Sequence, residues 1–318
     1  MTSFTTVVDN VTDNLATYHN ELVSALTLNE YAAAVPGGRL TLTSGTPVTT
    51  SDVTGATSVY YTPCTHDRIM LWNGTAWQYY TFTEKTLALG TVTSALPYDV
   101  FGYVSAGALA IEKLAWTNGT TRATAITLQD GRYAKSGDKT RLYLGTFYTT
   151  STTTTEDSGG GTSSQVGGKR FVWNMYNRVS RPLAVIDTTD TWSYTTDTIR
   201  QANGASGNKV EFVLGLSQSE VVAAVRGSVN LVSNTTRGAK IGVGVDSTSA
   251  FSGLVQQAFN DGAASLIFPI GGEYRGLLAA GYHYLAWCEK GGSAGTSTFT
   301  GDAGTSSAQS GLSTSVMG

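Results

Sequence analysis

Three aspartates in the second half of the chain have the residue type and spacing that acid–base chemistry on a sugar would need. Asp187, Asp190 and Asp197 flank two aromatic residues, Trp192 and Tyr194. Glycoside hydrolysis uses two carboxyl groups about 5 to 9.5 Å apart, and aromatic rings pack against apolar faces of ligands. The same residues also fit a solvated loop beside core aromatics, which is the interpretation we favour. A solenoid-type polysaccharide-cleaving enzyme would show a repeat along the chain, and the sequence has none.

Histidine and cysteine are too sparse for a metal centre or a nucleophilic pair. The three histidines, His19, His66 and His283, are isolated from one another, and the two cysteines, Cys64 and Cys288, are far apart. Cys288 and His283 are five positions apart on a predicted strand, so their side chains point to opposite faces. Cys64 and His66 share a face, but the turn that holds them has no third group. We therefore predict two free thiols, no catalytic residue, no metal site and no cofactor.

The composition is that of an all-β protein with little charge. The 318 residues include 37 glycines, and 41% are hydrophobic, but only 14% are charged where about 25% is usual. A net charge of −3 without a run of Lys or Arg excludes an electrostatic nucleic-acid surface. No apolar run approaches the ~20 residues of a membrane span, and the N-terminus does not resemble a signal peptide. We expect no nucleic-acid partner, no membrane insertion, and synthesis in a reducing cytoplasm.

The N-terminal segment, residues 1–37, differs from the rest because its apolar residues follow a helical period. Steps of three and four produce the seam of a short coiled coil. Val35-Pro36-Gly37 would end this helix. We predict an anchoring or oligomerising helix; the alternative is an amphipathic helix that lies on its own globular domain. The predicted seam consists of Val8, Val11, Leu15, Tyr18, Leu22 and Ala25.

Residues 38–135 are predicted to form a β-sandwich or barrel. Residues 68–72 and 76–82 are rich in aromatic and branched side chains, and Asn73-Gly74 between them is a strong hairpin signal. Asn118-Gly119 is a second Asn-Gly hairpin signal, between the predicted strands 114–116 and 122–126. Several short strands with regular turns are typical of these architectures.

Residues 136–290 are predicted to form a second, jelly-roll-like domain. Its Thr/Gly-rich tract 149–168 is so polar that we expect a solvated loop. Trp192 and Tyr194 are our candidate surface-binding aromatics, because exposed rings can stack on sugars or anchor protein contacts. The Gly/Ser/Thr-rich residues 291–318 are predicted to form an extended tail that either docks as a strap or stays loose.

Several segments resemble structural proteins of tailed bacteriophages. Residues 60–74, Tyr-Tyr-Thr-Pro-Cys-Thr-His-Asp-Arg-Ile-Met-Leu-Trp-Asn-Gly, resemble one recurrent segment. A second such module is suggested by later segments, and the similarity covers roughly residues 39–318. Those later segments are 141–147, 171–178, 192–194, 200–203 and 282–287.

The resemblance implies a virion appendage: a tail fibre, a head fibre or a decoration protein. Such proteins are usually homotrimers that are anchored by an N-terminal part and display a β-rich head. We therefore expect a fold of one N-terminal helix followed by two β-sandwich or jelly-roll-like domains, assembled as a trimer on the virion. The expected partners are other virion proteins, further copies of the chain, and a host-surface glycan or protein. A capsid-bound head fibre or decoration protein is the first alternative, and a polysaccharide-cleaving spike is the second.

Overall fold

The protein is almost entirely β-structure. The computed structural model describes residues 17–22, 35–160, 166–232, 237–262, 264–304 and 309–318. Residues 17–22 are helical, and two seam residues, Tyr18 and Leu22, are exposed there. The other predicted seam residues lie outside the described residues: Val8, Val11, Leu15 and Ala25.

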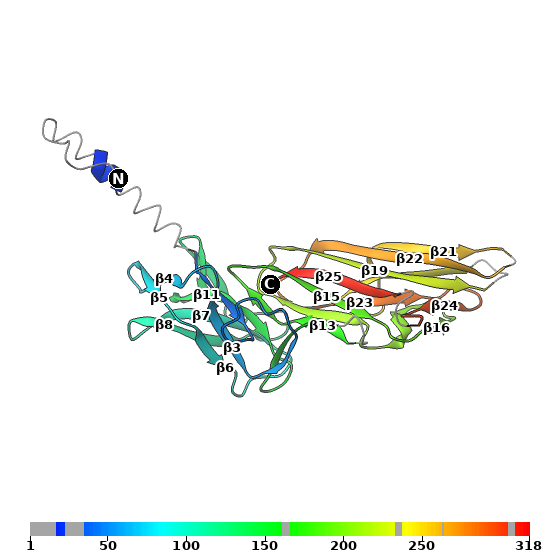
Figure 1. Cartoon of the computed structure of the whole chain (residues 1–318), viewed down its shortest axis with the longest axis horizontal. Helices are drawn as coiled ribbons and strands as arrows, with labels where there is room; N and C mark the ends of the chain where they lie inside the picture. Colours follow the sequence, from blue (N-terminus) through cyan, green and yellow to red (C-terminus); the bar gives the residue numbers. More distant parts are fainter. Residues whose placement is uncertain (1–16, 23–34, 161–165, 233–236, 263, 305–308) are drawn as a thin grey trace.

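Two bodies follow one another along an elongated molecule (Figure 1). The first body contains a three-stranded sheet in the order β1-β3-β6, the hairpin β4-β5, and a six-stranded sheet in the order β8-β7-β11-β10-β9, with β14 paired to β11. The strands of this body are β1 (Gly38–Thr41), β3 (Ser58–Pro63), β4 (Arg68–Trp72), β5 (Trp77–Thr81), β6 (Lys85–Ala88), β7 (Pro97–Ser105), β8 (Ala108–Ala115), β9 (Ile126–Gln129), β10 (Arg132–Lys135), β11 (Asp138–Tyr148) and β14 (Val172–Asn174).

The second body is a sandwich whose two layers join into one sheet. Its path is β15-β25-β19-β22-β21-β20-β23-β18-β13-β12-β2, and β16, β17 and β24 pair at its sides. The strands are β2 (Val53–Ala56), β12 (Thr155–Gly160), β13 (Gly167–Arg170), β15 (Ser180–Ile186), β16 (Thr191–Tyr194), β17 (Ile199–Gln201), β18 (Lys209–Leu214), β19 (Glu220–Leu231), β20 (Arg237–Val245), β21 (Ser252–Asn260), β22 (Leu266–Leu277), β23 (Gly281–Lys290), β24 (Ser297–Thr300) and β25 (Gly311–Met317), and a short 3-10 turn, η2 (Ala202–Gly204), follows β17.

Period-two alternation builds both cores. On β19, Val221, Ala223 and Val225 are buried while their neighbours are more exposed, because successive strand side chains point to opposite faces. These side chains join a core that includes Trp173 and Trp287. A second apolar cluster lies within the first body, whereas the larger core extends across the boundary to Phe101, Tyr143 and Trp173 on first-body strands.

The two predicted Asn-Gly hairpins have different outcomes. The first is confirmed: β4 and β5 pair up to Trp72 and Trp77, and Gly74 has a φ of +103°, which glycine tolerates. The second, at Asn118-Gly119, does not continue as a ladder. A single bridge joins Trp116 and Arg122, and the Arg122 guanidinium enters the junction between the bodies instead.

The sheets do not divide at the predicted boundary between residues 135 and 136. β11, expected to open the second domain, pairs with β7 and β10 of the first body. Conversely β2, which comes early in the sequence, pairs with β12 of the second body. The chain therefore crosses between the bodies several times. The predicted boundary differs because it pairs strands that are close in sequence, whereas the partners of β2 and β11 are distant in sequence.

Two polar segments are strands rather than loops. The tract 149–168 contributes β12 and the start of β13, and Thr155 and Asp157 are buried there. The expectation of a solvated loop was wrong for residues 155–160 and 167–168, because backbone pairing and arginine partners satisfy the polar groups there. In the tail 291–318, β25 lies between β15 and β19 as an internal strand. That part of the tail is neither a loose end nor a strap on a neighbour.

A buried polar network lies where the two bodies meet, and two of its arginines donate hydrogen bonds across the boundary; we call this network the junction. Asp157 accepts from Arg170 Nη1 at 3.1 Å and from Arg181 Nη2 at 2.9 Å, and Arg181 Nη1 reaches the Thr49 carbonyl of the first body at 2.6 Å. Arg122 Nε lies 2.7 Å from Asp99 Oδ2, and its Nη2 donates to the Gly215 carbonyl at 2.7 Å. These charges are paired and hydrogen-bonded, as buried charges must be.

Candidate functional site

The predicted surface aromatics occupy two different environments. Trp192 is only 8% exposed: it packs beside Trp287, and its Nε1 donates to Glu289 Oε2 at 2.6 Å. Trp192 is therefore a core residue in this structure, because its indole N–H has a buried acceptor. Tyr194 is half-buried. The Arg200 guanidinium covers its ring at 3.8 Å, so one face of that ring is already occupied.

The three aspartates near these rings are engaged separately. Asp187 is fully buried and accepts from the amides of Asn203 and Asn208. Asp190 is exposed and accepts from the Gly304 N–H, whereas Asp197 Oδ1 pairs with Lys290 Nζ at 2.7 Å. Each carboxyl group thus has its own structural partner.

A buried acid that the sequence did not reveal lies next to this group. Glu289 accepts from Trp192 and Arg200, and Asn203 links it to Asp187. Burial raises the pKa of Glu289 in spite of these donors, whereas in Asp187 the donated hydrogen bonds outweigh burial and lower the pKa. Divergent carboxyl pKa values are a feature of acid–base pairs. Both side chains are 0% exposed, however, so no substrate can reach them in this structure.

The hollow with the clearest geometry lies where β21 and β22 separate. These successive strands pair only at Leu254 with Glu273 and at Val255 with Gly272. Beyond that point β21 stays with β20, and β22 stays with β19 as far as Leu231 and Leu266. We call residues 256–260 and 266–271 the open edge, because among the described strands none pairs with these two edges from within the gap.

The sequence explains why the strands part. Pro269 has no N–H, so it fits a strand only where that side faces away from a ladder. Gly272 marks the closing point: a Cβ there would lie 2.7 Å from the Gly242 Cα and 2.9 Å from the Leu254 carbonyl oxygen. Only glycine permits β22 to cross β20 this closely. The proline inside the apolar run 266–270 is the signal by which this edge could have been found from sequence.

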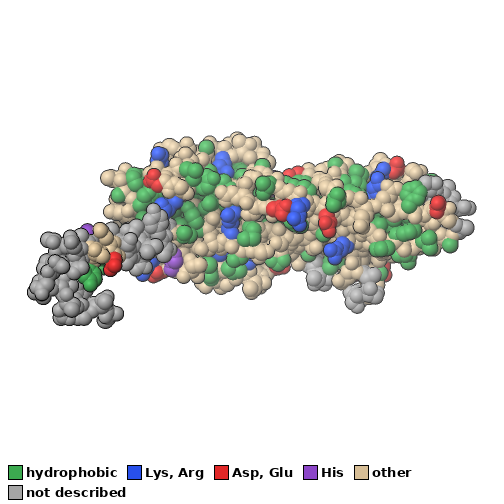
Figure 2. All heavy atoms as spheres, turned by 90° about the horizontal axis from the view of Figure 1, so that it is seen from above, with side chains coloured by type: hydrophobic (Ala, Val, Ile, Leu, Met, Phe, Trp, Pro, Cys, Tyr) green, Lys and Arg blue, Asp and Glu red, His purple; other side chains and the backbone are tan. Residues whose placement is uncertain are grey.

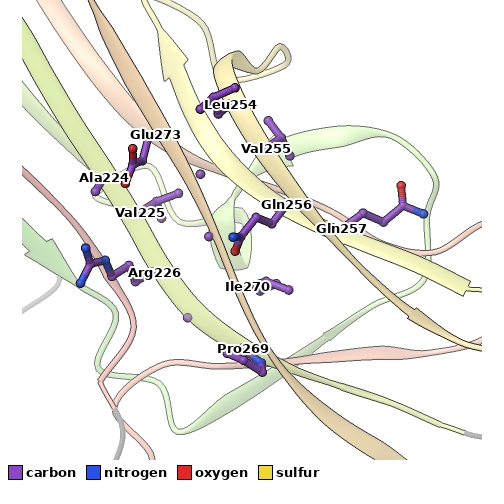
Figure 3. A pocket seen from close by; sticks show the side chains of 13 residues that line it. Ala224, Val225, Arg226, Leu254, Val255, Gln256, Gln257, Pro269, Ile270 and Glu273 are labelled. Atoms are coloured by element: carbon purple, nitrogen blue, oxygen red, sulfur yellow. The ribbon is translucent and has the colours of Figure 1, made fainter.

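The groove at the open edge has a volume of about 1050 Å³ and a mixed lining. Figure 3 shows Gln256 extending from β21 toward β22, with Ile270 nearby and Arg226 and Glu273 on the side of β19. In the described part of the chain, neither Arg226 nor Glu273 has an ion-pair partner. The groove is therefore lined by one cation, one anion, two side-chain amides and apolar surface.

Other kinds of site are not apparent in the ranges that the structure describes. No three His, Cys, Asp or Glu side chains gather there as a metal ion would require. Among the same residues, no helix is long and apolar enough to cross a bilayer. Cys64 and Cys288 are free thiols, and burial raises the pKa of Cys288 to about 12.

Comparisons with known proteins give no family. No family model matches the sequence, and no curated protein matches it. The solved structures that align are remote. A Bacillus thuringiensis Cry1Da tryptic core variant is 7% identical with a TM-score of 0.19, over 91% of this chain and 53% of its own length. The chain thus spans about half of that structure.

Two further aligned structures differ in kind. The infectious bursal disease virus Gx strain structure is 11% identical with a TM-score of 0.21, over 90% of this chain and 68% of the viral one. An exo-β-1,3-galactanase from Phanerochaete chrysosporium is 10% identical with a TM-score of 0.15, over 87% and 84% of the two chains. At these scores the likenesses carry no argument about function.

Proposed function

We propose that this protein is a non-enzymatic structural component of a tailed-phage virion, a trimeric fibre or spike. Its N-terminal helix anchors or assembles it, and its β-rich bodies contact the host surface. The second body is a jelly-roll-like head in this proposal, and the trimer resides on the virion. One observation carries the proposal: Leu22, on the predicted seam, is 62% exposed within the helical residues 17–22.

The exposure of the seam separates two interpretations of the helix. An amphipathic helix lying on its own domain would bury its apolar stripe against that domain. Here Leu22 is largely exposed and Tyr18 is 37% exposed. Side chains at such positions gain burial when further helices pack against them. This favours a helix whose partner is another chain, either a copy of itself or another virion protein.

The bodies suit a rigid exterior part. They form an elongated object, and at their junction buried arginines of each body donate hydrogen bonds to backbone carbonyls of the other, Arg181 to Thr49 and Arg122 to Gly215 (Figure 1). Only 14% of the residues are charged, and hydroxyl side chains are abundant. Asp187 and Glu289 serve as internal hydrogen-bond acceptors, which supports a binding role over turnover.

The mass of the full-length chain in solution tests the proposal. Sedimentation velocity at micromolar concentration is expected to show a threefold mass. A Tyr18→Ser/Leu22→Ser variant then locates the assembly: loss of the trimer makes the helix the oligomerisation element, and retention leaves it as the anchor. Asn20→Ser, an exposed non-seam residue of the same helix, is the matched control. A monomer throughout would overturn the fibre in favour of a monomeric decoration protein.

A further inference from the structure

Exposed large apolar side chains are frequent on three strands of the second body. Thirteen large apolar side chains are exposed in the described part of the chain, and six of them lie on β19, β21 and β22. Val222, Ile267 and Leu277 lie on one face of the β19–β22 ladder, whereas Leu266 points to the other face. Exposed apolar side chains that share a face can mark an interaction site. Figure 2 looks down on the side where β21 and β22 lie in Figure 1, and apolar side chains are interspersed there with few charged ones. The six are Val222, Leu254, Phe259, Leu266, Ile267 and Leu277.

The open edge adds hydrogen-bonding capacity to this apolar surface. Residues 266–271 pair with β19 on one side only, and residues 256–260 pair with β20 on one side only. Strand edges of this length are templates for pairing with another chain, and proteins normally protect them. Pro269 removes one donor, but the neighbouring positions keep their N–H groups, so the edge can still bind an added strand.

The charges on the same surface are balanced. Arg226 and Arg275 on one hand, and Glu220 and Glu273 on the other, lie on β19 and β22. Arg275 Nη1 is 3.6 Å from Glu220 Oε2, whereas Arg226 and Glu273 have no ion-pair partner among the described residues. A surface of one sign would repel its own copy. This surface carries both signs, so an unpaired cation and an unpaired anion can each meet the opposite charge on an identical molecule.

We propose that the open edge and the exposed apolar side chains beside it, Leu254 and Ile267, form the contact between copies of this chain. A strand edge of one copy adds to the open edge of the next, Leu254 and Ile267 become buried, and Arg226 and Glu273 gain partners. The occupant is a second copy because apolar, charge-balanced surfaces are typical of homo-oligomers. This inference rests on the self-association in the proposed function and assigns a surface to it.

Charge substitution in the full-length chain tests the contact. Leu254 and Ile267 are 73% and 71% exposed, so Leu254→Glu and Ile267→Glu leave the core intact. Each is expected to weaken self-association at least about tenfold, because a carboxylate would be desolvated in the contact. Leu128→Glu is the matched control: Leu128 is 56% exposed on β9 of the other body. Sedimentation velocity over a concentration series measures the association constants.

Hydrogen exchange locates the contact independently. In the wild type, amides of 256–260 and 266–271 should exchange more slowly as concentration rises, and in Ile267→Glu this dependence should vanish. Unchanged association in both glutamate variants, or an equal loss with Leu128→Glu, would overturn the contact. If only Tyr18→Ser/Leu22→Ser dissociates the oligomer, the inference fails while the fibre stands. A wild type that is monomeric at all concentrations rejects both.

Discussion

The junction and the open edge handle polar and apolar side chains in opposite ways. At the junction, Asp157, Arg170 and Arg181 are charged and nearly inaccessible, and each has a partner within the chain. At the open edge, Leu254 and Ile267 are apolar and more than 70% exposed. Buried charge with complete pairing fixes geometry within one molecule, whereas exposed apolar surface reduces free energy only when something covers it. The contacts at the junction are complete within one chain, whereas the apolar side chains at the open edge can be covered only by a partner.

The largest effect is expected at the junction. Asp157→Asn leaves Arg170 and Arg181 buried beside an uncharged amide, so the free energy of unfolding should fall by about 3–5 kcal/mol. Thermal unfolding and urea titration would measure this loss. Asp197→Asn removes an exposed partner of Lys290 and should cost under about 1 kcal/mol. Equal losses of unfolding free energy in the two variants would show that the buried pairs of Asp157 stabilise the protein no more than the exposed Asp197–Lys290 pair does.

A smaller effect is expected where the open edge begins. Gly272→Ala places a methyl group against Gly242 and the Leu254 carbonyl, so it should cost about 1–3 kcal/mol through overpacking. Gly119→Ala is the control, because the nearest neighbour of its Cβ is 4.0 Å away. Chemical denaturation of both variants measures the difference. If Gly272→Ala is neutral, the crossing of β22 over β20 is looser than described.

The buried His283 and its more exposed partner Asp246 provide an intermediate, pH-dependent case. Burial alone would lower the pKa of His283, but hydrogen bonds with Asp246 and the Ala279 carbonyl outweigh it and raise the pKa. The folded state therefore binds the proton more tightly than the unfolded state. This stabilisation is complete below the ordinary value near 6.5 and is lost as pH rises through the folded pKa.

The melting temperature of the wild type should accordingly contain a contribution from His283 that falls as pH rises above about 6.5. His283→Gln should remove that contribution, and Asp246→Asn should reduce it while keeping the acceptor for the Tyr284 N–H. Melting curves between pH 5.5 and 8.5 provide the comparison. If the melting temperature depends on pH equally in the wild type and in both variants, titratable groups other than His283 cause that dependence.

The smallest effect on the monomer is expected at the open edge itself. Ile267→Ser removes a side chain that is 71% exposed, so the unfolding free energy at low protein concentration should change by no more than about 0.5 kcal/mol. The same substitution should weaken self-association clearly. A large loss of monomer stability would mean that Ile267 already packs within its own chain.

Local signals in the sequence predicted local structure well. The β4–β5 hairpin followed from Asn73-Gly74, and the all-β class followed from composition and alternation. One local signal, Asn118-Gly119, gave a single bridge and no hairpin, and the remaining errors concerned long-range pairing. β11 joins the first body, and β2 joins the second, since strand pairing between distant segments leaves no mark in either segment alone.

The candidate sites were harder to predict for a related reason. Trp192 was expected at the surface, but its buried position depends on Glu289, which lies 97 residues later. The tract 149–168 was expected to be solvated, but Asp157 within it is neutralised by Arg170 and Arg181. Pro269 did carry usable information, because a proline inside an apolar run is typical of an edge strand.

The position of β25 has a consequence for how the protein is made. Leu312 pairs with Val185 on one side and with Val225 on the other, so β15 and β19 have no direct contact through their ladders until this segment arrives between them. During synthesis the chain emerges from its N-terminus, and the first body can assemble early. In the second body, β15 and β19 each lack their β25 partner until residues 311–317 leave the ribosome. Its folding is therefore dominated by distant pairings, which are slow to form.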